Sequence, residues 1–383
     1  MHEAAVNLAE LERVFEKNFT ERGELGASVS VWKRGEEIVS LHRGWCERQQ
    51  ERPWTAETLV PFYSCTKGLA AATMLMVLEE QGLNPDDKVR AVWDQFPIEQ
   101  GSFAQLMSHR LGLAALDTAA TTWDHDEVIA AVEKQQPNWP LYDESGGSGG
   151  HGYHPRVMGF MLDELVRRMT GNTLGNVWRE KIAEPLGIEA WIGLPESEFH
   201  RVASLYPGKQ SQADVGSEFY KQLATRDSLV QKAFASPRGM QSVREMNEPR
   251  AWQAGFPAMG GVGTATAVAT FYQAACGAIE FFSPQVREWM ECTRSSGDDK
   301  ILCTPTAFSC GFQLDPLDSF GRKIRHHYGL SRRAFGHPGA GGSLAFGDPE
   351  NGLSFCYLMN QMELCSLPKD KSLDLVKAIY LSQ

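Results

Sequence analysis

The sequence predicts an α+β fold, in which an antiparallel sheet is flanked by terminal helices and an all-α lobe is inserted into the chain. Three observations support this. β-Rich segments joined by turn signals occur near both ends of the sequence. An amphipathic helical pattern precedes the first of these segments and another follows the last. The section between them is mostly helical and rich in loops. We therefore expect an α/β domain from residues 1–85 plus 245–383, and a helical domain from residues 86–244.

The N-terminal part of the chain carries a helix signal followed by a hairpin signal. Residues 4–22 place apolar side chains at helical spacing. Residues 27–32 and 38–41 are β-rich, and Lys33-Arg34-Gly35-Glu36 between them is typical of a hairpin turn. A polar linker, residues 47–58, then leads to the segment on which the functional prediction depends.

The rest of the chain also carries local helix and strand signals. The expected helices of the inserted lobe are residues 103–109, 127–135, 155–169 and 174–182, and residues 265–278 and 284–291 are expected to form helices that rejoin the first domain. Residues 343–346 and 353–360 predict two strands joined by a turn, Asp348-Pro349-Glu350-Asn351-Gly352. A final helix is expected at residues 371–381.

Composition excludes several classes of protein. The chain has 383 residues, of which 42% are hydrophobic and 22% charged, as in soluble globular proteins. Its net charge of −11 argues against nucleic acid or an anionic membrane as a partner. The N-terminus reads as a charged amphipathic helix instead of a signal peptide, so we expect a cytoplasmic protein with reduced thiols. The oligomeric state is left open.

Residues 62–82, FYSCTKGLAAATMLMVLEEQG, form the central functional candidate. An extended start is followed by a strong helical pattern that ends at Gly82. Ser64 stands where an N-cap serine is expected, and Lys67 is one turn further on the same face. A serine hydroxyl needs a neighbouring base to become a nucleophile, and a lysine whose pKa is lowered can act as that base. The alternative is an ordinary helix cap beside a surface lysine.

Spacing alone does not decide between these readings. Ser-x-x-Lys occurs at Ser64/Lys67 and also at positions 30/33 and 366/369. Only Ser64 opens a helix after an extended segment, and this context favours catalysis. The neighbouring Cys65 points about 100° away on a helix, so we interpret it as a small packing residue.

Two further segments are candidates for the same site. Tyr153 precedes Pro155, which we place in the first turn of a helix, so its hydroxyl is able to reach a cleft. The alternative is a buried aromatic residue without a function. The glycine-rich segment at residues 336–343, GHPGAGGS, leads into a predicted edge strand and lets backbone approach a ligand closely. Its N–H groups could complete an oxyanion hole with that of Ser64. The alternative is a simple tight turn.

Two literal motif matches are set aside. Residues 146–150 fit Gly-x-Ser-x-Gly and residues 147–152 fit Gly-x-Gly-x-x-Gly, but the polar, turn-like sequence before them is not a buried strand. We expect a flexible loop. The histidines show no metal-binding spacing beyond His151-x-x-His154, so neither a metal nor another cofactor is expected.

Taken in order, these elements resemble the serine β-lactamase and penicillin-binding-protein superfamily, to which the Ser-x-x-Lys signature belongs. Within it the chain looks most like class C β-lactamase-type hydrolases, specifically the family VIII carboxylesterases. The stretches that carry the resemblance are residues 62–67, 105–113, 152–154, 247–270 and 335–362. It implies a β-lactamase/DD-peptidase-like fold.

The resemblance also implies roles for individual residues. Ser64 would be the nucleophile that forms an acyl-enzyme, and Lys67 and Tyr153 would share proton transfer. The N–H groups of Ser64 and Ala340 would form the oxyanion hole. The substrate-binding residues expected on the glycine-rich strand are His337, together with the glycines at 339 and 341.

The sequence departs from true β-lactamases of this class at two motifs. Tyr-x-Asn is replaced by Tyr153-His154-Pro155, and Lys-Thr-Gly by residues 337–339, HPG. The amide and the lysine that bind a β-lactam are thus absent, although His337 could partly replace the lysine as a donor or cation. We therefore expect hydrolysis of small or short-acyl esters. The alternatives are weak β-lactamase, D-amino-acid peptidase or acyltransferase activity at the same site, or a non-catalytic interaction module.

Overall fold

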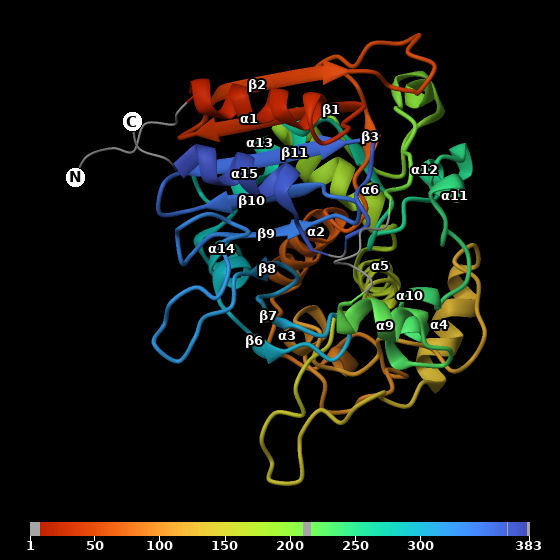
Figure 1. Cartoon of the computed structure of the whole chain (residues 1–383). Helices are drawn as coiled ribbons and strands as arrows, with labels where there is room; N and C mark the ends of the chain where they lie inside the picture. The colour runs from red at the N-terminus through yellow and green to blue at the C-terminus, as the bar shows by residue number, and fades with distance from the viewer. Residues whose placement is uncertain (1–7, 210–215, 366, 381–383) are drawn as a thin grey trace.

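An eight-stranded antiparallel sheet organises the part of the chain that the structure, a computed structural model, describes: residues 8–209, 216–365 and 367–380 (Figure 1). The strand order is β2-β1-β11-β10-β9-β8-β7-β6. The bounds are β1 Gly26–Lys33, β2 Glu36–Gly44, β6 Ser295–Asp298, β7 Pro305–Phe308, β8 Gln313–Leu314, β9 Phe335–Pro338, β10 Leu344–Asp348 and β11 Leu353–Met359. Both predicted hairpins are confirmed, since β1 pairs with β2 and β10 with β11.

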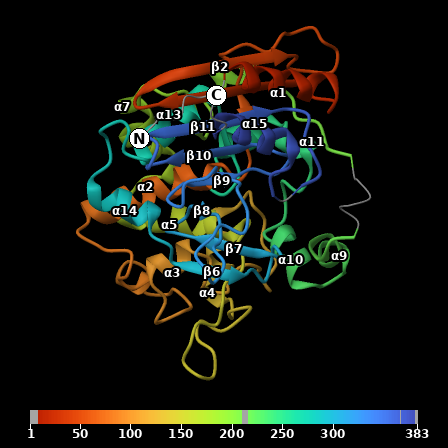
Figure 2. The same ribbon diagram turned by 60° about the vertical axis from the view of Figure 1, so that its left-hand side comes forward.

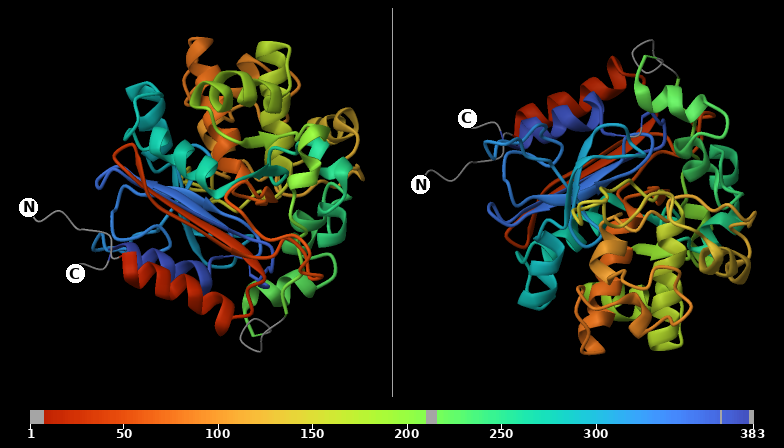
Figure 3. Two further views of the ribbon diagram at one scale, coloured as in Figure 1. Left: turned by 90° about the horizontal axis from the view of Figure 1, so that it is seen from above. Right: turned by 90° about the horizontal axis from the view of Figure 1, so that it is seen from below.

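The two terminal helices cover one face of this sheet (Figure 3). Helix α1, Leu8–Thr20, packs against α15, Asp370–Tyr380. Their apolar stripes meet the side chains of Phe346 on β10 and Phe355 on β11 in one buried cluster. The predicted terminal helices are confirmed where described, and residues 4–7 and 381 lie outside the described part of the chain.

The opposite face of the sheet packs against α13, Ala265–Ala275 (Figure 2). Side chains alternate across a strand, so Ala345 and Cys356 lie on this side while their neighbours face the terminal helices. The Ser354 hydroxyl donates to the carbonyl of Ala269 at 2.7 Å and ties β11 to α13. The central strands β10 and β11 are therefore buried on both faces, whereas the edge strands β2 and β6 are largely exposed.

The helical section lies beside the sheet. Its elements before strand β4, Ala190–Ile192, are η1 Val89–Ala91, α3 Phe103–Met107, α4 His125–Lys134, α5 Val157–Thr170, α6 Leu174–Trp178, a π-helical turn η2 Arg179–Ala183 and α7 Glu184–Leu186. After strand β4 come η3 Glu196–Arg201, α9 Glu218–Ala224, α10 Leu229–Ala235, α11 Val243–Met246 and α12 Pro249–Ala254. Helix α14, Pro284–Glu291, follows α13 and contacts α2, Thr66–Glu80. A second sheet joins β3 Val60–Pro61, β5 Gly261–Gly263 and β4 Ala190–Ile192. The domain boundaries at residues 85/86 and 244/245 stay a prediction.

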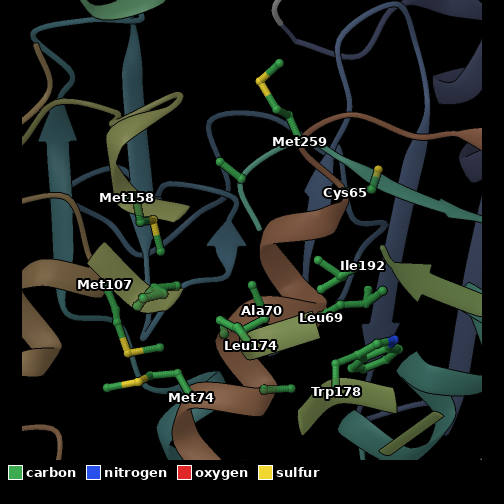
Figure 4. Packing of buried hydrophobic residues seen from close by; sticks show 14 of the residues in the cluster. Cys65, Leu69, Ala70, Met74, Met107, Met158, Leu174, Trp178, Ile192 and Met259 are labelled. Atoms are coloured by element: carbon green, nitrogen blue, oxygen red, sulfur yellow. The ribbon is translucent and has the colours of Figure 1, made fainter. Parts of the chain in front are cut away.

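Helix α2, Thr66–Glu80, runs through the middle of the molecule. Its side chains are buried almost all round, and Figure 4 shows Leu69, Ala70 and Met74 among residues from neighbouring elements. A helix that is apolar on every side needs such surroundings. This packing holds the start of α2 in a fixed place relative to the sheet. None of the helices in the described residues has the length and apolar composition needed to cross a membrane.

Two local predictions were wrong. Ser64 is not the N-cap of α2, because the helix begins at Thr66 and the cap position is Cys65, which makes no side-chain capping bond. The Ser64 hydroxyl is instead directed to Lys67. The strand after the glycine-rich segment is not at an edge, since β10 pairs with β9 on one side and β11 on the other. Its N–H and C=O groups are therefore used within the sheet.

Candidate active site

Ser64 occupies a strained turn between β3 and α2. The preceding residue, Tyr63, has φ +47°, a left-handed conformation that costs a bulky residue on the order of 1–3 kcal/mol. The turn is held by hydrogen bonds from the N–H of Phe62 to Gly261 (3.1 Å) and from that of Cys65 to Phe62 (3.2 Å). The Ser64 N–H donates no hydrogen bond within the described residues. It remains available to an oxyanion.

Lys67 is the buried base candidate. Its side chain is 1% exposed, and Nζ lies 3.4 Å from the hydroxyl oxygen of Ser64. The same Nζ donates to the carbonyls of Pro155 and Ala258, each at 2.8 Å. A neutral amine has two N–H groups and one lone pair. With both N–H groups taken by carbonyls, the lone pair of a neutral Lys67 faces Ser64.

The charge state of Lys67 agrees with this geometry. Burial lowers the pKa of Lys67 well below its ordinary value, and the positive charge of Arg156 lowers it further. Arg156 is itself buried, and its guanidinium donates to the carbonyls of Pro237, Gly239 and Met240. Burial lowers the pKa of Arg156 to about 10, so it stays a cation at neutral pH. The surroundings therefore favour the neutral amine at Lys67.

Tyr153 reaches the site from the loop before α5. Its side chain is 6% exposed, its ring centre lies 4.9 Å from Lys67 Nζ, and both it and Ser64 line one small cavity. Burial raises the pKa of Tyr153, while the neighbouring Ser64 side chain lowers it. Its hydroxyl makes no hydrogen bond with good geometry to any described residue. At neutral pH it is a protonated phenol available to a ligand.

Helix α5 begins later than predicted, and this places Tyr153. The helix starts at Val157 with Arg156 as N-cap, so Pro155 lies before it. The Pro155 carbonyl accepts from Lys67 instead of an α-helical N–H. The Tyr153 N–H donates to the buried carboxylate of Asp299 at 3.0 Å. The same carboxylate accepts from three more donors, the N–H groups of Ile301 and Leu302 and the hydroxyl of Thr306.

The glycine-rich segment brings Ala340 next to Ser64. A Cβ on Gly339 would lie 2.4 Å from the Phe62 carbonyl, so only glycine lets the segment come this close. The thiol of Cys65 donates to the His337 carbonyl at 3.1 Å and ties β9 to α2. The N–H of Ala340 donates no hydrogen bond within the described residues. The two N–H groups expected in the oxyanion hole are thus both unused, on adjoining segments that line shared cavities.

His337 lies beside Tyr153, with ring centres 5.8 Å apart. Its Nδ1–H donates to the Pro338 carbonyl at 2.8 Å, which leaves Nε2 unprotonated and without a partner in the described residues. Burial lowers the pKa of His337 to about 3. An imidazole is mostly uncharged at neutral pH, as expected from the sequence, and burial makes this ring fully neutral. The suggested role as a donor or cation in place of the lysine is contradicted, because Nε2 presents an acceptor.

The remaining sequence predictions at the site have mixed outcomes. Cys65 is buried and its burial raises its thiol pKa, which confirms a packing role. Gly341 shapes the segment, with φ +91° and its carbonyl accepting from the N–H of Glu363 at 2.8 Å. Residues 146–150 follow no buried strand, which confirms that neither literal glycine motif applies. The pair 366/369 includes residue 366, which lies outside the described residues.

Sequence reasoning missed three contributors to the site. Arg156 and Asp299 are charged residues without a motif, and Ala258 contributes a backbone carbonyl, which no side-chain pattern can reveal. One signal was present for Arg156. It is the charged residue at the start of an otherwise apolar helical pattern, a position where burial of a charge is costly unless it has a role.

Comparisons with known proteins agree on the family and fold. The family model described as Beta-lactamase matches residues 11–376. The chain is 27% identical over 365 residues to the protein named Esterase/beta-lactamase LipL of Mycobacterium tuberculosis, covering 91% of this chain and 80% of that protein. A solved structure of a family VIII carboxylesterase superposes with TM-score 0.83 and 29% identity, and a penicillin-binding protein homolog from Caulobacter crescentus with 0.82 and 29%. Each covers 99% of this chain and 98% of the other. The predicted resemblance and the α+β fold class are confirmed.

Proposed function

The chain belongs to the beta-lactamase family, and from that premise we propose that it is a serine carboxylesterase that cleaves small or short-acyl esters through an acyl-enzyme on Ser64. The observation that carries this proposal is the environment of Lys67. Two carbonyls bind its Nζ, and the remaining direction faces the Ser64 hydroxyl at 3.4 Å. A base in this position is placed to remove the proton of the Ser64 hydroxyl.

The acylation step follows from the positions of these groups. Lys67 takes the proton of Ser64 as its oxygen attacks the ester carbonyl carbon, and the N–H groups of Ser64 and Ala340 bind the negative oxygen that forms. The bond to the alcohol oxygen then breaks. Tyr153 gives its proton to that oxygen and recovers one from the Lys67 ammonium, so the alcohol leaves neutral. Neither Lys67 nor Tyr153 has changed its protonation state at the end.

Deacylation uses the same groups in reverse. A water molecule takes the place of the alcohol beside Tyr153 and attacks the acyl carbonyl carbon. Its proton passes to Tyr153 while Tyr153 passes its own proton to Lys67, which becomes an ammonium. The Ser64 oxygen leaves and receives the proton from Lys67. The acid product departs and the starting state is restored. This route needs no metal and no cofactor.

Esters fit this site better than β-lactams. A β-lactam carboxylate needs a cation, and the position of the missing lysine holds a neutral His337. An ester has no such requirement, and its alcohol is a better leaving group than an amine. We expect turnover of methyl butyrate, measured as the release of acid, and little or no turnover of nitrocefin by the same preparation. Efficient nitrocefin hydrolysis with inert esters would contradict the proposal and favour the β-lactamase alternative.

Tyr153→Phe tests the proton donor. We expect kcat/KM for ethyl butyrate to fall by about 100-fold, because the ethoxide leaves without a proton. The loss should be smaller for trifluoroethyl butyrate, whose alcohol is more acidic and needs less protonation. Each loss is measured against wild-type protein with the same ester, so the size difference between the two alcohols is already in the reference, and a packing defect is expected to lower both rates by similar factors. Equal losses would therefore argue against a proton-donating Tyr153.

Arg156→Met tests the charge that acts on Lys67. Activity requires the neutral amine, so kcat/KM is lost as pH falls through the Lys67 pKa. Removing the nearby cation raises that pKa, and we expect the acid limb of the pH profile to move to higher pH. The shift is partial, since burial is the larger cause and remains. Arg156→Lys keeps the charge and serves as control. An unmoved acid limb in a folded Arg156→Met variant would contradict this role.

A further inference from the structure

Two cavities of very different size meet at Ser64. The smaller, of about 40 Å³, is lined by Tyr153, His337 and Leu302 among others. The larger, of about 360 Å³, is lined mainly by apolar side chains that include Leu223 and Met240. Ser64, Phe234 and Ala340 line both. We call these the small chamber and the large chamber. They adjoin at the nucleophile and at Ala340.

The chemistry of the tetrahedral intermediate fixes which part of an ester enters each chamber. Its negative oxygen is bound by the two N–H groups and a second oxygen belongs to Ser64, so the remaining two substituents, the acyl carbon and the alcohol oxygen, diverge into different spaces. The alcohol oxygen must receive a proton to leave. Tyr153 lines the small chamber and does not line the large one. The alcohol therefore belongs in the small chamber.

The polar groups of the small chamber suit an alcohol or water. The Tyr153 hydroxyl is a proton donor without a partner in the described residues, and His337 Nε2 is an acceptor without one. A hydroxyl group can accept from the first and donate to the second. One water needs about 10–15 Å³ of such a cavity, so about 40 Å³ admits a methanol or ethanol but not a long alcohol.

The large chamber suits an apolar acyl group. Phe234, Met240 and Met259 present ring and thioether surfaces, and adaptable methionines tolerate acyl chains of varied shape. Arg156 lies at its wall, but its guanidinium donates to three backbone carbonyls. The chamber thus offers apolar contact over most of its surface. Burial of each further CH₂ of an acyl chain in this chamber strengthens binding through the hydrophobic effect.

We propose that the substrates are esters of methanol- or ethanol-sized alcohols with an uncharged, apolar acyl group larger than the alcohol. This rests on the proposed function, since it assigns the two sides of the same acyl-enzyme. Phe234, on α10, lines both chambers, and we assign to its ring the size limit on the alcohol side.

Two isomeric esters test the assignment. Methyl pentanoate and butyl acetate have the same formula and similar hydrophobicity, but the first has the larger acyl group and the second the larger alcohol. We expect kcat/KM for methyl pentanoate to exceed that for butyl acetate by at least about tenfold. Equal values, or a preference for butyl acetate, would overturn the assignment of the chambers.

Two variants and a minimal ester complete the test. Phe234→Ala joins the chambers, so the ratio should fall towards one. Leu223→Trp narrows the large chamber and should lower kcat/KM for methyl pentanoate by a larger factor than kcat/KM for methyl acetate. An unchanged ratio in the first variant, or equal loss on both esters in the second, would contradict the proposal.

If wild-type protein leaves methyl acetate intact, the proposed esterase function itself fails. If methyl acetate is cleaved and the isomer preference is reversed, only the chamber assignment fails.

Discussion

Ser64→Ala is expected to lower kcat for methyl butyrate by at least about 1,000-fold, the largest effect of any substitution in this chain. The variant removes the only atom that can form the acyl-enzyme, while the oxyanion N–H groups and Lys67 stay in place. Alanine is smaller than serine, and the hydroxyl is not a helix cap, so the fold should be kept. Acid release from methyl butyrate and the thermal midpoint, measured together, check both statements.

Cys65→Ala is the matched control for this variant. The thiol is the neighbouring nucleophile, but burial raises its pKa and its proton is donated to the His337 carbonyl. We expect this variant to keep most of the activity. Full activity in Ser64→Ala together with its loss in Cys65→Ala would assign the nucleophile to the thiol.

Lys67→Met is expected to lower kcat/KM by about 1,000-fold, or about 4 kcal/mol of transition-state stabilisation. Methionine has a similar length and no basic nitrogen, so Ser64 keeps its proton. The carbonyls of Pro155 and Ala258 lose their donor, and we also expect a lower thermal midpoint. Rates measured well below that midpoint separate lost chemistry from lost folding.

Lys33→Met is the control for Lys67. Position 33 belongs to another Ser-x-x-Lys match, on β1, where Lys33 pairs in register with Leu353 and Glu36 of neighbouring strands. We expect no loss of activity there. Retention of the full rate by Lys67→Met would show that another group removes the serine proton.

Sheet, terminal helices and nucleophile helix could be predicted because each has a local signal. The strands alternate, the hairpin turns have typical residues, and the helices have apolar stripes. Ser64, Lys67, Tyr153 and Ala340 were likewise found from short segments and their resemblance. Ser64, Tyr153 and Ala340 line one cavity, and Lys67 lies beside it, with Nζ 3.4 Å from the Ser64 hydroxyl oxygen and 4.9 Å from the Tyr153 ring centre. Their catalytic roles remain the proposal made above.

The electrostatics of the site could not be predicted from the same signals. The state of His337 depends on its burial and on a hydrogen bond to Pro338, and both are properties of the folded chain. The lowered pKa of Lys67 depends first on its burial and then on Arg156, which is far from it in sequence. Tyr153 is fixed by Asp299 from the far side of the inserted section. Such contacts are set by tertiary structure, and no local pattern encodes them.

Covalent trapping tests the central claim most directly. The protein is treated with a fluorophosphonate, and its intact mass and labelled peptide are determined by mass spectrometry. The account predicts one adduct per chain, on Ser64, that is absent in Ser64→Ala and unaffected in Cys65→Ala. An adduct on another residue, or an unmodified Ser64 in protein that still hydrolyses esters, would contradict it.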